Sequence, residues 1–424
     1  MSAPPSESDD PVGDPPPSPD EVTEPEPTPL LAPADGVPPL AIYADDIAAA
    51  AELLATGHGA FAVDAERASG FRYSNRAYLI QIRRAGAGTV LIDPVSHGRD
   101  PLQTLRPVAD VLSEDEWILH AADQDLPCLA ELGMRPPALY DTELAGRLAG
   151  FERVNLAAMV QRLLGLSLDK GHGAADWSQR PLPEPWLNYA ALDVEVLLEL
   201  RQAIADVLEQ QNKTEWAAQE FEYLRTCESP PTRRDRWRRT SGIHKVRNPQ
   251  ALAEVRALWN ARDAIARRRD IAPGRILPDA AIIEAALADP KTLAELTKLP
   301  VFGGPKQKRS AATWLAALAE GREDPDPPQR SEPNTGPPPA VRWSRRKPEA
   351  AARLEAARSA LAELSERIKV PTENLVSPET VRRLCWDWKP VPDPESVIEA
   401  FLIEAGSRPW QRELVVPVLS AALR

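Results

Sequence analysis

Four carboxylates and one tyrosine, at three places in the chain, have the types and spacing needed for metal chemistry. The stretch "AFAVDAE" ends an apolar segment with Asp64 and Glu66. Residues i and i+2 of an extended strand point to the same side, so these two side chains project together. Nearby carboxylates repel, and such a pair needs metal ions, protons or arginines. The stretch alone fits either a solvated strand end or half of a metal site.

Two further stretches supply the other candidates. "HAADQDL" places Asp123 and Asp125 after an apolar segment. We expect Asp123 to cap the following helix and Asp125 to lie in its first turn. "NYAALDVEVLL" supplies Tyr189 and Asp193, which share one face of a helix because they are four residues apart. Taken alone, Asp193 fits a surface aspartate equally well.

The set of four carboxylates indicates a site for two divalent ions. Asp64, Glu66, Asp125 and Asp193 are hard oxygen ligands of the type that Mg²⁺ and Mn²⁺ prefer. Two such ions, about 4 Å apart, stabilise both the attacking and the leaving oxygen of a phosphoryl displacement. The Tyr189 hydroxyl can orient the attacking water. A histidine base is not required, because a metal ion lowers the pKa of its bound water.

The surrounding pattern predicts a mixed α/β region that positions these residues. Apolar segments at 60–66, 77–84, 89–94 and 116–121 predict four strands, the first three as an antiparallel meander. Amphipathic spacing predicts a helix after Asn155, its N-cap, and one long helix over 183–211.

Composition and charge divide the rest of the chain. The 424 residues include 45 prolines and carry a net charge of −13. Residues 1–36 hold nine acidic and no basic residues, which predicts a disordered acidic, Pro-rich tail and leaves a body near −4. Arginine clusters at 233–247 and 262–270 fit nucleic-acid contact or a solvated surface equally well. The sequence shows neither a membrane-length apolar run nor a signal peptide, and its three distant cysteines indicate a reducing compartment.

The predicted organisation has three folded regions. The pattern places the mixed α/β region at 37–227, a basic linker at 228–247, a helical unit at 248–321, a Pro-rich linker at 322–345 and a second helical unit at 346–424. Residues 266–282 parallel residues 365–381, which predicts an internal repeat about 99 residues apart.

The three motifs together resemble those of the DEDDy exonucleases. "FAVDAE", "HAADQDL" and "YAALDVEVLL" match the three exonuclease motifs, and "LDKGHGAADWSQRPLP" resembles bacterial ribonuclease D. The helical units resemble HRDC domains, the second one diverged. The resemblance implies an α/β ribonuclease H-like exonuclease domain, a mixed sheet with flanking helices, followed by two all-α HRDC-type domains. It further implies Asp64, Glu66, Asp125 and Asp193 as metal ligands and Tyr189 as the residue that positions water.

The function that this resemblance implies is 3′–5′ exoribonuclease activity that releases nucleoside 5′-monophosphates. The expected partners are single-stranded RNA 3′ ends, including tRNA precursors, and the expected roles are tRNA 3′-end processing and stable-RNA turnover. We expect a cytoplasmic, monomeric enzyme without a membrane partner. Two alternatives stay open: a DNA exonuclease of the same fold and a noncatalytic nucleic-acid-binding protein.

Four further residues are candidates for substrate contacts. His120 precedes the second motif, and a structural hydrogen bond is the favoured interpretation. Lys170 and Arg180 flank "AADW" and fit either phosphate contacts or solvated loop charges. Lys306 lies in "FGGPKQKR", where a glycine turn before a basic helix start suits a phosphate. Trp177 is expected to be a core residue.

Overall fold

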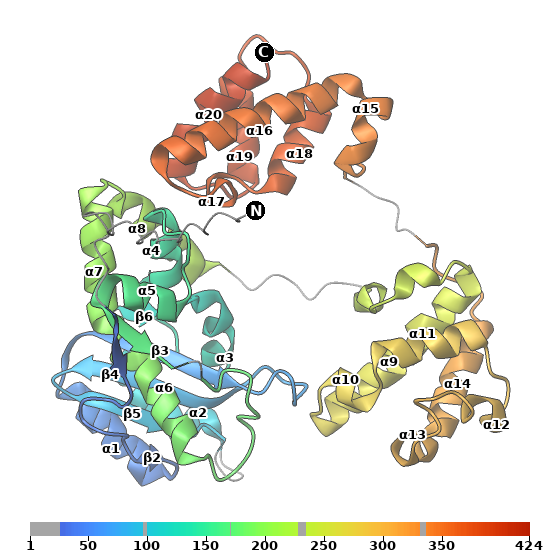
Figure 1. Cartoon of the computed structure of the whole chain (residues 1–424), viewed down its shortest axis with the longest axis horizontal. Helices are drawn as coiled ribbons and strands as arrows, with labels where there is room; N and C mark the ends of the chain where they lie inside the picture. Colours follow the sequence, from blue (N-terminus) through green and yellow to red (C-terminus); the bar gives the residue numbers. More distant parts are fainter. Residues whose placement is uncertain (1–25, 96–99, 170, 228–234, 331–335) are drawn as a thin grey trace, which may run out of the picture.

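The computed structural model describes residues 26–95, 100–169, 171–227, 235–330 and 336–424. An α/β region comes first along the chain, followed by two helical units (Figure 1). Of the predicted features, residues 1–25 of the tail, Lys170 and parts of both linkers lie outside the described residues. No helix in the described ranges is both long and apolar enough to cross a membrane.

A six-stranded mixed sheet forms the centre of the α/β region. Its strand order is β2-β5-β4-β3-β6-β7. β3, β4 and β5 pair antiparallel, while β2 with β5, β3 with β6, and β6 with β7 pair parallel. The predicted meander and fourth strand are confirmed. The strand bounds are β2 (Leu40–Ala41), β3 (His58–Arg67), β4 (Ala77–Ala85), β5 (Gly88–Ile92), β6 (Trp117–Leu119) and β7 (Leu139–Asp141).

Helices cover both faces of this sheet. Alternate residues of β3 pack on opposite sides: Phe61 and Val63 join an apolar cluster with α1 and α2, and Ala62 packs toward α7. The predicted long helix is divided at Val196 into α6 and α7, and Asn155 caps α5 as predicted, accepting from the backbone N–H of Ala158 at 3.0 Å. The helix bounds are α1 (Ala44–Ala55), α2 (Pro101–Leu112), α3 (Leu126–Glu131), α4 (Thr142–Leu148), α5 (Leu156–Leu164), α6 (Glu184–Glu195), α7 (Leu197–Gln210) and α8 (Thr214–Thr226).

Part of the predicted disordered tail is ordered. β1 (Thr28–Leu30) pairs parallel with β8 (Leu166–Leu168). The Asn188 side chain also donates to the Leu31 carbonyl at 2.9 Å. The prediction of disorder through residue 36 is therefore wrong for residues 28–30. The physical reason is that backbone hydrogen bonds to β8, far along the chain, order a short segment whose apolar content alone would not fold it.

The two helical units repeat the same arrangement of helices. In each, a 21-residue helix is followed by a four-residue and then a ten-residue helix. The helices α16, α17 and α18 each begin 99 residues after α9, α10 and α11, so the predicted internal repeat is confirmed. The bounds are α9 (Pro249–Arg269), α10 (Pro273–Ile276), α11 (Asp279–Ala288), α12 (Leu293–Leu296), α13 (Pro305–Arg309), α14 (Ala311–Arg322), α15 (Trp343–Arg346), α16 (Pro348–Ile368), α17 (Thr372–Leu375), α18 (Pro378–Asp387), α19 (Pro394–Glu404) and α20 (Pro409–Ala422).

The ends of both predicted linkers belong to the helical units. Residues 235–247 include two short 3-10 turns, Arg236–Arg239 and Ile243–Lys245, and Trp237 is buried in the core of the first unit. Trp343 is likewise buried in the core of the second unit. The predicted linker bounds therefore differ from the structure. Each of these Arg- or Pro-rich stretches carries a tryptophan, and burial of that side chain in the adjacent apolar core fixes the end of the stretch to the helical unit.

Candidate active site

The strand β3 brings Asp64 and Glu66 to one place. In the antiparallel register Asp64 lies opposite Gln81 of β4 and Glu66 opposite Leu79. The Gln81 side-chain amide donates to Asp64 Oδ2 at 2.8 Å. This buried amide fixes one carboxylate oxygen, and the sequence reasoning did not single it out. A polar residue within the apolar run "AYLIQI" is the signal that could have found it.

Asp193 reaches the same place from α6, which packs across β3, β4 and β5. Ligand oxygens of Asp64, Glu66 and Asp193 all lie within 4.8 Å of one another, a spacing that can hold a metal ion. Among the described residues, Asp125 is not part of this group. The structure thus brings three of the four predicted carboxylates together.

Asp125 lies beside the group and is paired with an arginine. Its Oδ1 is 3.2 Å from Arg67 Nη2, and Arg67 also donates to the Gln124 carbonyl. Asp125 is the residue before α3, and Asp123 does not cap this helix, so the predicted capping role of Asp123 is wrong. Asp123 instead lies within a 3-10 helix, Ala122–Gln124, and Asp125 occupies the N-cap position of α3 without a side-chain cap hydrogen bond.

A second buried aspartate holds the loop that leads to Asp125. The Asp141 carboxylate accepts backbone hydrogen bonds from Ala121 at 3.2 Å, Ala122 at 2.8 Å and Leu144 at 3.1 Å. Ala121 has a left-handed backbone with φ of 60°, which is unusual for a residue other than glycine. The bonds from Ala121 and Ala122 hold this loop in its strained shape, and the bond from Leu144 caps the start of α4.

Burial and mutual repulsion make the four carboxylates hard to ionise. Burial, followed by the charges of Asp64, Asp193 and Asp125, raises the pKa of Glu66 to about 10. Burial and then Asp64 raise the pKa of Asp125 to about 8. Burial raises the pKa values of Asp64 and Asp193 as well. Such a cluster is stabilised by bound cations or protons.

Tyr189 lies over this cluster and is packed tightly from the other side. Burial and then the Asp193 charge raise the pKa of Tyr189, so its hydroxyl keeps its proton. A Cβ added to Gly171 would lie 1.9 Å from the Tyr189 ring. The His172 ring meets the Tyr189 ring edge-on at 5.9 Å. Gly171 and His172 thus set the position of Tyr189. The sequence reasoning missed both, although "GHG" directly before "AADW" could have marked them.

A cavity of about 310 Å³ opens onto these groups. Its lining includes Asp64, Asp193, Tyr189, Gly171 and His120. Leu168 of β8 and residues of α5 and α7 complete the lining of the cavity. Pockets of this size take small ligands or parts of larger ones.

His120 lines the cavity, and one of its ring nitrogens is hydrogen-bonded to another residue of the protein. Its Nδ1 lies 2.9 Å from the Thr142 hydroxyl. Burial lowers the pKa of His120 to about 4, so the ring is neutral at physiological pH. The favoured structural hydrogen bond is present, and a neutral imidazole at the cavity wall can still contact a substrate.

The other predicted substrate contacts lie elsewhere. Arg180 is fully engaged: its Nε and Nη2 bind the Asp93 carboxylate at 2.6 and 2.8 Å, and its remaining hydrogen bonds go to backbone carbonyls. This geometry does not favour a phosphate contact. Lys306 donates to the Arg275 carbonyl in the first helical unit. Trp177 is fully buried, as expected for a core residue.

Models of known families match three parts of the chain. A 3′-5′ exonuclease model matches residues 41–209 and an HRDC model matches residues 251–318. Residues 336–423 match a model described as a 3′ to 5′ exonuclease C-terminal domain. The first helical unit is therefore an HRDC domain. Because a different model matches the second unit, two HRDC domains are not confirmed.

Curated relatives carry one name. Ribonuclease D of Granulibacter bethesdensis is 31% identical over 304 residues, which span 68% of this chain and 73% of that protein. The chain belongs to the ribonuclease D family. Ribonuclease D of Bartonella henselae is 34% identical over 243 residues, and this match spans 55% of the chain and 58% of the relative.

Solved structures agree with this assignment. A crystal structure of a protein from Bifidobacterium adolescentis has a TM-score of 0.84 at 36% identity and covers 94% of this chain and 100% of that one. RNase D of Escherichia coli, described as an exoribonuclease involved in structured RNA processing, has a TM-score of 0.64 at 25% identity, with 91% and 98% covered. The predicted family and enzyme class, a 3′–5′ exoribonuclease of the ribonuclease D type, are confirmed.

Proposed function

We propose that this protein removes nucleotides from RNA 3′ ends by hydrolysis that depends on two divalent ions, Mg²⁺ or Mn²⁺. The observation that carries the proposal is the convergence of Asp64, Glu66 and Asp193 within 4.8 Å, next to a cavity that Asp64 and Asp193 line. Their raised pKa values fit a site built for cations, because two bound divalent ions would offset the repulsion of four carboxylates. Hard oxygen ligands suit these two ions.

Each residue has a separate task in this proposal. Asp64, Glu66, Asp125 and Asp193 would hold the ions, and Asp125 would then be shared with Arg67, its partner at 3.2 Å. When bound, the ions supply a water of lowered pKa and stabilise the charge on the attacking and leaving oxygens. The protonated Tyr189 hydroxyl donates a hydrogen bond that orients the attacking water, and Gly171 lets its ring lie close enough. His120 contacts the substrate as a neutral ring.

The proposed substrate is single-stranded RNA with a free 3′ end, including tRNA precursors, and the products are nucleoside 5′-monophosphates. The proposed setting is tRNA 3′-end processing and stable-RNA turnover by a cytoplasmic monomer. The HRDC domain would hold the RNA body. The second helical unit, which repeats the HRDC arrangement at a spacing of 99 residues, is proposed to be a diverged HRDC-like domain.

The test compares Asp64→Asn with Asp123→Asn, an exposed aspartate two residues from Asp125. We expect Asp64→Asn to lose more than about 100-fold in rate, the upper end of the loss when only a residue supporting a metal ligand is changed. Asp123→Asn should keep most activity. Products of a 3′-extended tRNA and of a DNA strand of matched sequence are identified by mass, with Mg²⁺, with Mn²⁺ and with a chelator.

Three outcomes would contradict the proposal. Full activity of Asp64→Asn at saturating Mg²⁺ would remove the site assignment. Faster release from DNA than from RNA would make the protein a DNA exonuclease. Release that persists in the chelator would exclude the metal ions. Melting curves of both variants show whether any lost activity is only lost folding, and Asp64→Asn should melt no lower than wild type without metal because it removes a repelling charge.

A further inference from the structure

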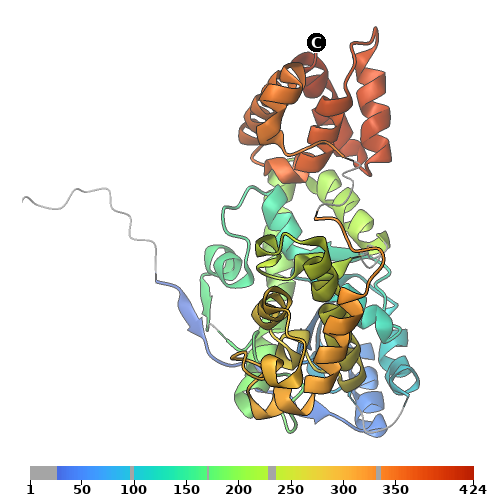
Figure 2. The same ribbon diagram turned by 90° about the vertical axis from the view of Figure 1, so that its right-hand side faces the viewer.

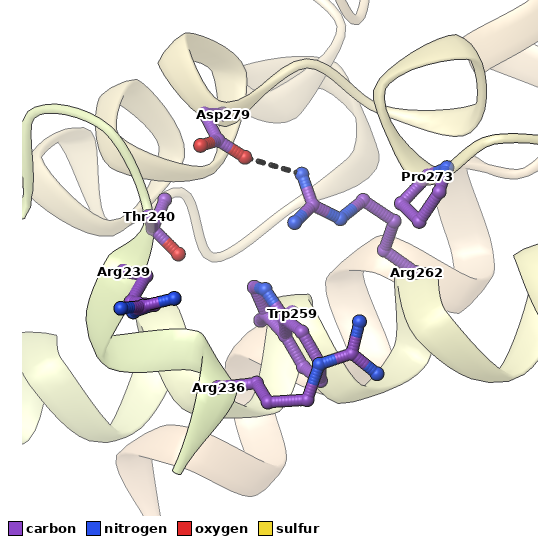
Figure 3. Close-up of a pocket in the computed structure, with 7 residues that line it drawn as sticks. All are labelled: Arg236, Arg239, Thr240, Trp259, Arg262, Pro273 and Asp279. Atoms are coloured by element: carbon purple, nitrogen blue, oxygen red, sulfur yellow. Dashed lines mark hydrogen bonds and ion pairs between the residues drawn. The ribbon is translucent and has the colours of Figure 1, made fainter. Parts of the chain in front are cut away.

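A second cavity, of about 420 Å³, lies on the HRDC domain (Figure 3). One side is formed by the end of the predicted linker, with Arg236, Arg239 and Thr240. The other side is formed by Trp259 and Arg262 of α9, together with Pro273 and Asp279 at the starts of α10 and α11. Figure 3 shows Arg239 and Thr240 facing Arg262 across this space, while the Arg236 side chain runs alongside Trp259.

The charge in the cavity is mainly positive. Three guanidinium groups line it against one carboxylate. Arg236 and Arg239 are exposed, and the part of the chain that the structure describes shows no carboxylate partner for either. Two positive side chains held apart from acidic partners are available to an anion.

Arg262 is a buried arginine that is only partly satisfied. It is 4% exposed, and its Nη1 binds Asp279 Oδ1 at 2.6 Å and the Leu277 carbonyl at 3.0 Å. Its Nε is buried without a hydrogen-bond partner among the described residues. A buried donor without a partner has a free-energy cost that an incoming acceptor removes. This is an independent sign of a ligand in the cavity.

Trp259 gives the cavity an aromatic wall. Its half-buried ring lies 5.5 Å from the Arg236 guanidinium carbon and 5.8 Å from that of Arg262. These cation–π contacts restrict both arginines and so reduce the entropy lost when they bind an anion. The ring also offers a flat apolar surface of the type on which nucleic-acid bases stack.

The helical scaffold does not need these residues. The repeat places Arg358 and Leu361 of α16 at the positions of Trp259 and Arg262, 99 residues later. The second unit forms the same helix arrangement with a leucine in place of the buried arginine, and Leu361 lies in its apolar core. A buried arginine at this position is therefore a feature of the first unit alone and not a requirement of the fold.

We propose that this cavity binds one nucleotide of the RNA strand, with its phosphate on Arg236, Arg239 and Arg262 and its base or ribose against Trp259. The proposal rests on RNA as the substrate. The volume of the cavity is in the range of small-ligand sites and is larger than a lone phosphate needs. The site lies on the HRDC domain, whereas the carboxylate cluster lies on the exonuclease domain, so it holds the strand away from the reacting 3′ end.

The test measures binding of a labelled single-stranded RNA to the full chain in a chelator, over a range of salt concentrations. The test variant is Arg236→Ala with Arg239→Ala, both exposed. The matched control is Arg345→Ala with Arg346→Ala, two exposed arginines of α15 that carry the same charge change. We expect about tenfold weaker binding at low salt for the test variant and a salt slope shallower by about 1.4, from two lost phosphate contacts.

Two further measurements make the result decisive. Trp259→Leu should weaken binding of RNA more than binding of inorganic polyphosphate, because polyphosphate loses only the restriction of the arginines whereas RNA also loses a surface for its base. The second measurement uses an oligonucleotide too short to extend from the active site to the HRDC domain. The metal-dependent release of nucleotides from it should be the same in the Arg236/Arg239 variant as in wild type. Equal affinity and equal salt slope for test and control variants would overturn the nucleotide site while leaving the exonuclease proposal intact. If the wild-type protein released no nucleotides from the short strand, the exonuclease proposal itself would be overturned.

Discussion

The HRDC domain touches the exonuclease domain through the loop 68–76, which directly follows Glu66 and Arg67. Asp270, at the end of α9, accepts from the Ser74 backbone N–H at 2.9 Å and from the Tyr78 hydroxyl at 3.3 Å. The Ala272 backbone N–H donates to the Phe71 carbonyl at 2.9 Å. This contact consists mainly of hydrogen bonds and charged groups.

The second helical unit packs on the other end of the exonuclease domain, against α4 and α8 (Figures 1 and 2). One continuous apolar cluster runs through both, and the Trp216 and Trp410 rings stack at 5.0 Å. Within this contact the buried Glu220 binds Arg408 at 2.6 Å and the Trp410 indole N–H at 2.8 Å.

Both contacts use the same corner of the repeat. Asp270 and Lys369 are 99 residues apart, each follows the long helix of its unit, and each has a left-handed backbone. Asp270 makes its contacts with its side chain, whereas Lys369 offers its backbone carbonyl to Lys213 Nζ at 3.5 Å and approaches Gly150 closely. A shared apolar core resists separation, while a polar contact to one loop can rearrange. The comparison shows that the second unit shares the apolar core of the exonuclease domain, whereas the HRDC domain is held by polar contacts to the loop that follows Glu66 and Arg67.

The largest effect is expected at the buried pair of the second unit. Glu220→Ala leaves Arg408 without its carboxylate and Trp410 without its acceptor, and we expect a loss of about 3 kcal/mol in the free energy of unfolding. Glu379→Ala removes an exposed carboxylate that pairs with the half-buried Arg382; it is the control and should cost less than about 1 kcal/mol. Denaturant unfolding measures both. Equal losses would show that this contact is no more structural than a surface ion pair.

A smaller effect is expected at the corner of the HRDC domain. An asparagine in Asp270→Asn can adopt the left-handed backbone of this position. Loss of the charge should weaken the hydrogen bonds to the loop 68–76 by about 1–2 kcal/mol. We expect faster hydrogen exchange in residues 68–76 and a severalfold lower kcat/KM on RNA. Lys369→Asn is the control, since Lys369 makes its contact through its backbone. Loss of activity in both variants, or in neither, would break the proposed division between the two units.

The smallest effect is a pH dependence confined to the HRDC domain. Burial and then the Asp289 charge raise the pKa of Glu254 from 4.5 to about 7. A raised folded-state pKa means that the stabilisation is complete below 4.5 and is lost as pH rises through 7. Glu254→Gln should therefore gain about 4 °C in melting temperature relative to wild type on going from pH 5 to pH 8. Arg353→Gln, at the equivalent position of α16, should show no such change. A pH-independent difference for Glu254→Gln would contradict the assignment.

Local spacing in the sequence determined which side chains project together and which elements form. The two-residue spacing of Asp64 and Glu66 and the four-residue spacing of Tyr189 and Asp193 follow from strand and helix periodicity, which depends only on near neighbours. The short loops between apolar segments predicted the meander, and the likeness of two distant stretches predicted the 99-residue repeat. The three motifs were enough to predict the family. The metal-ligand roles of the carboxylates stay predictions.

Contacts between distant segments were decided by the tertiary structure alone. The meeting of Asp64 with Asp193, the pairing of Asp125 with Arg67, the strand that residues 28–30 add beside β8, and the ring of Tyr189 resting on Gly171 join segments that no periodic pattern connects. The same holds for Trp237 and Trp343, whose surrounding arginines and prolines suggested linkers although each tryptophan is buried. Burial of apolar surface and pairing of buried polar groups depend on which partners the whole fold brings within reach, and that information is not present in any local stretch of the chain.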